Sequence, residues 1–238
     1  EAFVASEGKK ILAMDYSQIE LRLMAHYSKD QIMLDSFKNN EDIHKRTASE
    51  VFSVEMENVT DEMRRRAKTI NFGLLYGMSA FGLSNQLSVS RAEAEEFLLN
   101  YFAKYSSIKV FMKDIVEQAK KDKYVSTLYG RKIHVPNIES PNYMLRQASE
   151  RAAVNGPLQG SAADIIKRAM INIFKESGGN EKDIKMILQV HDELVFEVPE
   201  DYDEKNISYL IDLMEESSSI DVPLKVEYGF GSNWREAH

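Results

Sequence analysis

The chain contains no cysteine among its 238 residues. This absence excludes a disulfide scaffold, a thiolate metal site and a cysteine nucleophile, and it is consistent with a reducing compartment. No apolar run approaches the roughly 18 residues that a membrane span requires, and no signal peptide is visible, so we expect no membrane partner. The sequence starts at Glu1 rather than Met, and we interpret it as the C-terminal piece of a longer protein.

Basic residues are outnumbered, with 30 Lys and Arg against 38 Asp and Glu and a net charge of −8. This balance counts mildly against a nucleic-acid-binding protein, but a basic groove can lie on an acidic molecule, so local charge matters more than the sum. The apolar fraction of 43% is enough for a sizeable core, in one large domain or two small ones.

Repeats and low-complexity stretches are absent, and strand and helix patterns come in blocks. Short apolar runs predict strands at 11–15, 184–190, 193–198 and 223–230. Helical patterns predict helices at 19–28, through most of 29–122, at 142–155, 159–177 and 204–217, with a hairpin at 124–136 and a loop at 177–183. The pattern predicts an α+β fold, in which a helical block is inserted into a small, mainly antiparallel sheet.

Two carboxylates follow buried-type strands. Asp15 ends the apolar run in KKILAMDYSQIELR, and Asp192 lies between the two runs of KMILQVHDELVFEV. Burying an unpaired carboxylate is costly, and oxygen-liganded Mg²⁺ is a natural partner for it. The alternatives are a cap or turn role for Asp15 and a solvent-facing hairpin tip for Asp192. Glu20 is either a further functional acid or a first-turn charge that suits the helix dipole.

A predicted helix at about 62–77 carries cations and aromatics at a spacing of four. Arg64, Lys68 and Phe72 therefore share one face, and Tyr76 continues the row. The cations suit phosphate, and the ring suits a base or sugar. An exposed basic turn followed by a core aromatic is the alternative. Metal-holding acids together with this helix favour nucleotidyl transfer onto the end of a nucleic acid.

Several polar residues add weaker signals. His44 is a candidate phosphate contact or an ordinary surface histidine on a helix. Arg151, Asn155 and Gln159 step by four and are suited to reading the minor groove, or they are ordinary polar helix residues.

Three segments of the chain together resemble the polymerase motifs of family A DNA polymerases, the bacterial polymerase I type. They are DYSQIELR at 15–22, RRRAKTINFGLLYG at 64–77 and VHDE at 190–193. Further segments also resemble that family: EDIHKRTASEVF, YGMSAFGLS, RAAVNGPLQGSAADIIKRAM and NWREAH. The resemblance covers essentially the whole chain, with the motifs in the right order.

The resemblance implies roles for individual residues. Asp15 and Asp192 would hold two Mg²⁺ ions together with the Tyr16 carbonyl, with Glu193 as an auxiliary acid. Arg64, Lys68 and His44 would grip the incoming triphosphate, and Lys68 would protonate the leaving pyrophosphate. Phe72 would stack near the incoming sugar and base, Glu20 would be the steric gate against a 2′-hydroxyl, and Gln18 and Arg22 would support the site.

The resemblance also implies contacts with the nucleic acid. Tyr76 and Gly73 would lie at the templating base. The residues that would contact primer and template are Arg151, Asn155, Gln159 and His191.

At the level of the molecule, the resemblance implies the palm of a right-hand polymerase at 1–29 and 149–238, with helical fingers at 30–148 and the thumb absent from this chain. The implied partners are primer–template DNA, dNTPs and upstream thumb and exonuclease domains. The implied reaction is template-dependent DNA synthesis in replication and repair, in a bacterial cytoplasm or an organelle. Two alternatives stay open: a thumb-less fragment that binds without efficient turnover, and a two-metal nuclease or phosphohydrolase.

Overall fold

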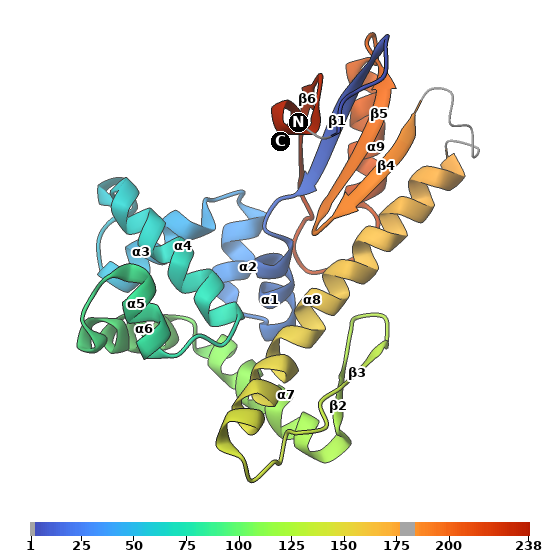
Figure 1. Cartoon of the computed structure of the whole chain (residues 1–238). Coiled ribbons are helices and arrows are strands. Elements are labelled where there is room, and N and C mark those ends of the chain that lie inside the picture. Colours follow the sequence, from blue (N-terminus) through green and yellow to red (C-terminus); the bar gives the residue numbers. More distant parts are fainter. Residues whose placement is uncertain (1–2, 177–183) are drawn as a thin grey trace. The chain divides into compact units, whose positions relative to one another are not determined.

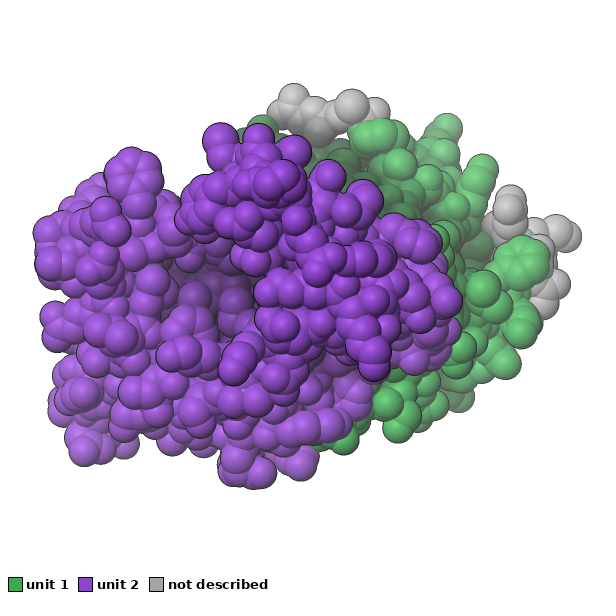
Figure 2. Space-filling view, turned by 90° about the horizontal axis from the view of Figure 1, so that it is seen from below, with its two compact units in different colours: residues 1–19, 162–238 green, residues 20–161 purple. Residues whose placement is uncertain are grey.

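A computed structural model describes residues 3–176 and 184–238. Contacts divide the chain into two compact units, shown in Figure 2. Unit 1 consists of residues 1–19 and 162–238, and unit 2 of residues 20–161. The loop predicted at 177–183 lies outside the described residues.

Unit 1 is built on a four-stranded antiparallel sheet. Its strands lie in the order β4 (Lys185–Val190), β5 (Glu193–Pro199), β1 (Lys9–Tyr16) and β6 (Val226–Gly231). The apolar run Ile11–Met14 is buried in β1, which has a neighbour on each side. This burial explains why the run is continuously apolar rather than alternating. Helices α9 (Glu204–Glu215) and α10 (Trp234–Ala237) complete the unit, and both contact β6.

Unit 2 is mainly helical (Figure 1). Its helices are α1 (Ile19–Ser28), α2 (Gln31–Lys38), α3 (Ile43–Phe52), the 3₁₀ turn η1 (Met56–Asn58), α4 (Asp61–Leu75), α5 (Ala80–Leu87), α6 (Arg91–Lys104) and α7 (Ser106–Asp122). A hairpin of β2 (Tyr124–Ser126) and β3 (Lys132–His134) turns at Gly130, whose φ is +79°. The predicted hairpin is therefore confirmed.

Side-chain caps explain where many of these helices begin. A side-chain oxygen accepts from the first turn at Asp30, Asp42, Thr60, Ser79 and Ser90. Ser90 and Glu93 form a capping box at the start of α6, because each side chain accepts from the other's backbone N–H. The α+β fold class is confirmed as well, with a small antiparallel sheet and a helical block.

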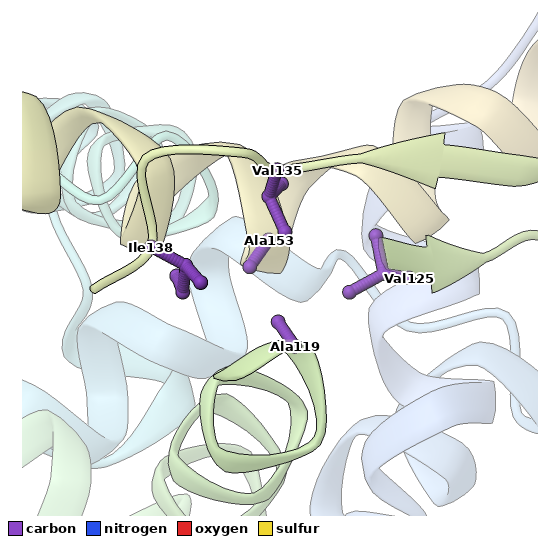
Figure 3. Close-up of a cluster of buried hydrophobic side chains, with 5 residues drawn as sticks. All are labelled: Ala119, Val125, Val135, Ile138 and Ala153. Atoms are coloured by element: carbon purple, nitrogen blue, oxygen red, sulfur yellow. The ribbon is translucent and has the colours of Figure 1, made fainter. Parts of the chain in front are cut away.

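The predicted break between helices at 142–155 and 159–177 is wrong. One helix, α8, runs over Tyr143–Glu176 with Pro157 inside it. Gly156, which with Asn155 and Pro157 suggested the break, serves packing instead, as does Gly160: a Cβ on Gly156 would lie 3.3 Å from Ile133 Cδ1, and one on Gly160 only 2.6 Å from Thr127 Cγ2. The hairpin thus approaches the α8 backbone closely, and Ala153 joins Ala119, Val125, Val135 and Ile138 in a buried cluster (Figure 3). The helix continues through Pro157, although a proline in a helix interior costs roughly 3 kcal/mol.

Among the described residues, no helix combines the length and the apolar character that crossing a membrane would need.

Candidate active site

Three acidic residues meet at one end of paired strands in unit 1. Asp15 lies opposite Glu193 in the β1–β5 register. The Tyr16 N–H donates to the Asp192 carbonyl oxygen over 3.2 Å, which ties the end of β1 to the β4–β5 turn. The structure therefore brings together the two carboxylates predicted from separate strands, with Glu193 beside them.

Asp15 is the perturbed acid of this group. Burial raises the pKa of its carboxyl to about 7, and the charges of Asp192 and Glu193 add to the rise, while His238 opposes it. An acid destabilised by burial and by like charges is stabilised by a cation.

The donor set fits a divalent metal on a structural observation as well. Asp15 Oδ1 is buried and accepts no hydrogen bond from any described residue. An oxygen in that condition costs free energy unless a ligand binds it. Within residues 3–176 and 184–238, no three or more His, Asp or Glu side chains are grouped so that they alone could hold a metal ion. A metal ion bound at Asp15 would therefore need further ligands besides these side chains.

Glu193 is held by two residues of the C-terminal NWREAH segment, to which the sequence analysis assigned no individual role. Its carboxylate is 4% exposed. Oε1 accepts a hydrogen bond from Trp234 Nε1 over 3.0 Å and lies 3.6 Å from His238 Nδ1. This contact was not predictable from sequence. Trp234 and Glu193 are 41 positions apart and meet only when the strands of the sheet pair.

Unit 2 contains the second cluster, on α4. Arg64 is half-buried and Lys68 exposed, and Phe72 is half-buried on the same row. The Arg64 guanidinium donates from Nε to Asp42 Oδ2 over 2.6 Å. Burial of the Asp42 carboxyl works against its ionisation, but hydrogen bonds from Arg64 and from the Lys45 and His44 backbone outweigh this and lower its pKa.

His44 lies beneath this row and is not a surface residue. Its side chain is 2% exposed, so the surface alternative is wrong. Its ring centroid is 5.7 Å from that of Phe72. Burial lowers the pKa of His44 to about 4; Asp42 opposes this effect, while Arg64 and Lys68 reinforce it. His44 is therefore a neutral imidazole at neutral pH.

The end of α4 forms a hollow with the first turns of α8. Gly77 has a φ of +65°, which favours glycine, and a Cβ there would lie 2.5 Å from Arg151 Cγ. A Cβ on Gly73 would lie 3.2 Å from Met78 Sδ. The hollow has a volume of about 450 Å³ and is lined by Tyr76, Gly77, Met78, Ser79, Gly82, Gln147, Glu150 and Arg151.

The remaining predicted residues are spread over both units. In unit 1, Gln18 has a φ of +55° and His191 is exposed at the β4–β5 turn with a φ of +52°. In unit 2, Arg22 is buried with its guanidinium 4.6 Å from the Phe37 ring centroid. Three others lie in helices of unit 2: Glu20 in α1, and Asn155 and Gln159 in α8.

Comparison with known proteins gives a consistent picture. The family model described as DNA polymerase family A matches residues 1–236. The chain is 52% identical over 241 residues to DNA polymerase I of Pseudomonas aeruginosa, and 44% identical over 238 residues to that of Bacillus subtilis, covering all of this chain each time. A solved structure, the POL domain of Pol1 from M. smegmatis in complex with DNA primer-template and dNTP, superposes with a TM-score of 0.93 at 44% identity over 99% of this chain.

The chain covers only part of each protein it resembles. It spans 26% of the Pseudomonas aeruginosa protein, 27% of the Bacillus subtilis protein and 42% of the M. smegmatis chain. Properties of those whole proteins therefore belong to them and carry over only as hypotheses.

Proposed function

The chain belongs to DNA polymerase family A, and from this premise we propose that it catalyses template-dependent transfer of a nucleotide from a dNTP to a primer 3′-hydroxyl, releasing pyrophosphate. The observation that carries the proposal is the Asp15 carboxylate, whose buried Oδ1 has no hydrogen-bond donor among the described residues and whose pKa burial and two neighbouring acids raise to about 7. Such a site favours a cation over solvent.

In the proposed mechanism, Asp15, Asp192 and the Tyr16 carbonyl would hold two Mg²⁺ ions, with Glu193 as an auxiliary acid. Bound there, the ions would supply activation of the attacking oxygen and charge neutralisation at the leaving oxygen. Nucleotidyl transfer needs little covalent help from the protein beyond alignment and charge. The strand pairing of Asp15 with Glu193 supports this role, because rigid strands hold donors in place.

The α4 cluster serves the incoming nucleotide in this proposal. Arg64, Lys68 and His44 bind the triphosphate, and Lys68 donates a proton to the leaving pyrophosphate. Phe72 packs near the sugar and base, Glu20 excludes a 2′-hydroxyl, and Gln18 supports the site. The shared face of Arg64, Lys68 and Phe72 on α4 supports this assignment.

Residues at the end of α4, on α8 and at the β4–β5 turn serve the nucleic acid in this proposal. We propose that Tyr76 and Gly73 lie at the templating base, and that Arg151, Asn155, Gln159 and His191 contact primer and template. The hollow that Tyr76 and Arg151 both line supports the role of Tyr76 at the templating base.

The proposed palm comprises residues 1–29 and 149–238, and the proposed fingers residues 30–148. The compact units divide after residues 19 and 161, within about a dozen residues of these boundaries. Replication and repair synthesis in a bacterial cytoplasm is the proposed setting.

The test is Mg²⁺-dependent extension of a primed template by this chain. We expect Asp192→Ala to lose at least about 100-fold in rate, because an electrostatic contribution of several kcal/mol disappears. Asp201→Ala, which removes an exposed acid of the same unit, is the matched control and should extend normally. Equal extension by both variants would contradict the proposal.

A nuclease or phosphohydrolase is the rival two-metal activity, and Lys68→Ala separates it from a polymerase. Extension by this variant should fall at least about 10-fold, whereas degradation of DNA by a nuclease would not need a cation that grips a triphosphate. Lys121→Ala, which removes an exposed lysine on α7, is the control. Normal extension by Lys68→Ala would overturn the assignment of Lys68.

A further inference from the structure

A buried polar network lies between α3 and α4, which pack side by side (Figure 1). Its members are Asn71, Thr47 and Tyr105, with exposed fractions of 1%, 1% and 0%, together with the His44 ring. Thr47 Oγ1 lies 3.1 Å from Asn71 Nδ2, 3.2 Å from Asn71 Oδ1 and 3.2 Å from the Tyr105 hydroxyl. A buried network of this kind specifies one arrangement when every member is satisfied.

Asn71 connects this network to His44. Its Nδ2 lies 3.1 Å from His44 Nδ1. The amide nitrogen can only donate, so Nδ1 is the acceptor and the ring proton of a neutral imidazole is on Nε2. The Phe72 ring packs at 45° to the imidazole plane and restricts its rotation.

Burial favours the neutral form of the His44 ring; Arg64 and Lys68 reinforce that effect and Asp42 opposes it. Asp42, Arg64 and Lys68 are the charged groups that act on it, and all three belong to unit 2. A neutral imidazole has one N–H, and its position decides whether the ring offers a donor or a lone pair to an anion. With Nδ1 occupied by Asn71, the free edge of the ring carries the donor.

We propose that Asn71 is a positioning residue of the nucleotide site: its side-chain amide holds His44 in the Nε2–H tautomer, so that the ring donates a hydrogen bond to a phosphate oxygen of the incoming dNTP. The inference rests on the proposed function for the identity of the anion, but not for the hydrogen bond itself. Thr47 and Tyr105 orient Asn71, and Asn71 orients His44.

The first test reads the tautomer directly in the unmodified chain. Long-range ¹H–¹⁵N spectra of the unmodified chain at pH 7 distinguish a protonated Nε2 from a protonated Nδ1, and His44→Gln assigns the His44 signals among the five histidines. We expect Nε2–H. A ring protonated on Nδ1 would overturn the inference, whatever the chain does in extension assays.

The second test uses the pH dependence of dNTP use in primer extension. In the unmodified chain, the KM for dNTP should show no contribution from His44 between pH 6 and 8. In Asn71→Asp, the carboxylate accepts from Nδ1, so His44 titrates in this range and its neutral form presents a lone pair at Nε2. We expect KM to rise about 10-fold with pH, with a smaller change in kcat, as for one lost hydrogen bond to a charged group.

Asn100→Asp is the matched control. Asn100 lies on α6, and its Nδ2 donates to the Val51 carbonyl over 3.2 Å, away from His44. The same change of amide to carboxylate there should leave the pH profile unaltered. A profile of Asn71→Asp that matches that of Asn100→Asp would overturn the positioning role. An Nε2–H tautomer in a chain that neither extends primers nor binds dNTP would instead overturn the proposed function and the phosphate contact with it.

Discussion

At the scale of the residue, the buried carboxyl of Asp15 makes the stability of the fold depend on pH. Its pKa is about 7 in the folded chain and 3.8 ordinarily, so the unfolded chain ionises first. Stability is therefore lost as pH rises from about 4 to about 7, and the loss persists above pH 7. We expect Asp15→Asn in EDTA to raise Tm by about 2–6 °C at pH 8, because the variant has no buried charge at this position. The corresponding gain in the free energy of unfolding is roughly 1–2 kcal/mol after allowance for solvent screening. It should change little at pH 4.

Calorimetry at pH 4, 6 and 8 checks this expectation, with Asp201→Asn as an exposed control. A Tm increase that is the same at all three pH values would show that Asp15 is not the titrating group.

The contact of Trp234 with Glu193 leads to a second prediction at this scale. Trp234→Phe leaves a carboxylate that is 4% exposed without its 3.0 Å donor. An unsatisfied buried acceptor costs about 1–3 kcal/mol, so we expect Tm to fall by about 2–10 °C. Glu193→Gln should suppress much of that loss in the double variant. Far-ultraviolet circular dichroism is the measurement, because Trp234 is the single tryptophan; strictly additive effects would argue against the hydrogen bond.

Some features of the candidate site were predictable from sequence. The shared face of Arg64, Lys68 and Phe72 follows from local spacing on α4, and the places of Asp15 and Asp192 follow from the apolar runs beside them; their roles stay predictions. Asp42, Asn71 and Trp234 were missed. Their partners Arg64, His44 and Glu193 lie 22, 27 and 41 positions away, and no local period records such pairs.

At the scale of the element, α8 shows how tertiary packing overrides local signals. The helix continues through the helix-breaking sequence Asn155–Gly156–Pro157. The β2–β3 hairpin packs closely against the α8 backbone there, because Gly156 and Gly160 have no side chains in the way. Helix starts depend on more local signals, since a cap such as Ser90 with Glu93 involves only neighbouring residues.

Gly160 tests this account of α8. An added Cβ would lie 2.6 Å from Thr127 Cγ2 and 2.9 Å from Ile133 Cδ1. We expect Gly160→Ala to lower Tm by about 2–8 °C, because overpacking of about 1–3 kcal/mol outweighs the helix-propensity gain of roughly 1 kcal/mol. Gly156→Ala, whose added Cβ would meet atoms at 3.3 Å, is the control and should change Tm less.

Thr127→Ser supplies the rescue. It removes Cγ2 but keeps the hydroxyl that accepts from the Tyr129 and Arg131 N–H groups. The double variant should recover part of the lost Tm. If Gly160→Ala is neutral or stabilising on its own, close approach of the hairpin does not explain the glycine.

At the scale of the whole molecule, the fold class was predictable and the strand order was not. A strand, a long helical block and a group of strands predict an α+β fold. The order β4-β5-β1-β6 depends on which edges of β1 are covered. The continuous apolar run Ile11–Met14, which is buried, favours a central position for β1. It carries no information on which strands lie on either side of β1.

The balance of charge over the whole chain leads to the last prediction. The net charge is −8, so the proposed affinity for primer–template DNA would have to come from local cations, each of which releases counterions where it meets a phosphate. The slope of log K against log salt should therefore be about −0.9 for each phosphate contact. Fluorescence anisotropy between 50 and 200 mM salt measures this slope for the chain and for the Pseudomonas aeruginosa relative, of which the chain spans 26%. The longer protein should give the steeper slope, because more contacts hold the duplex; equal slopes would place essentially all phosphate contacts within the 238 residues.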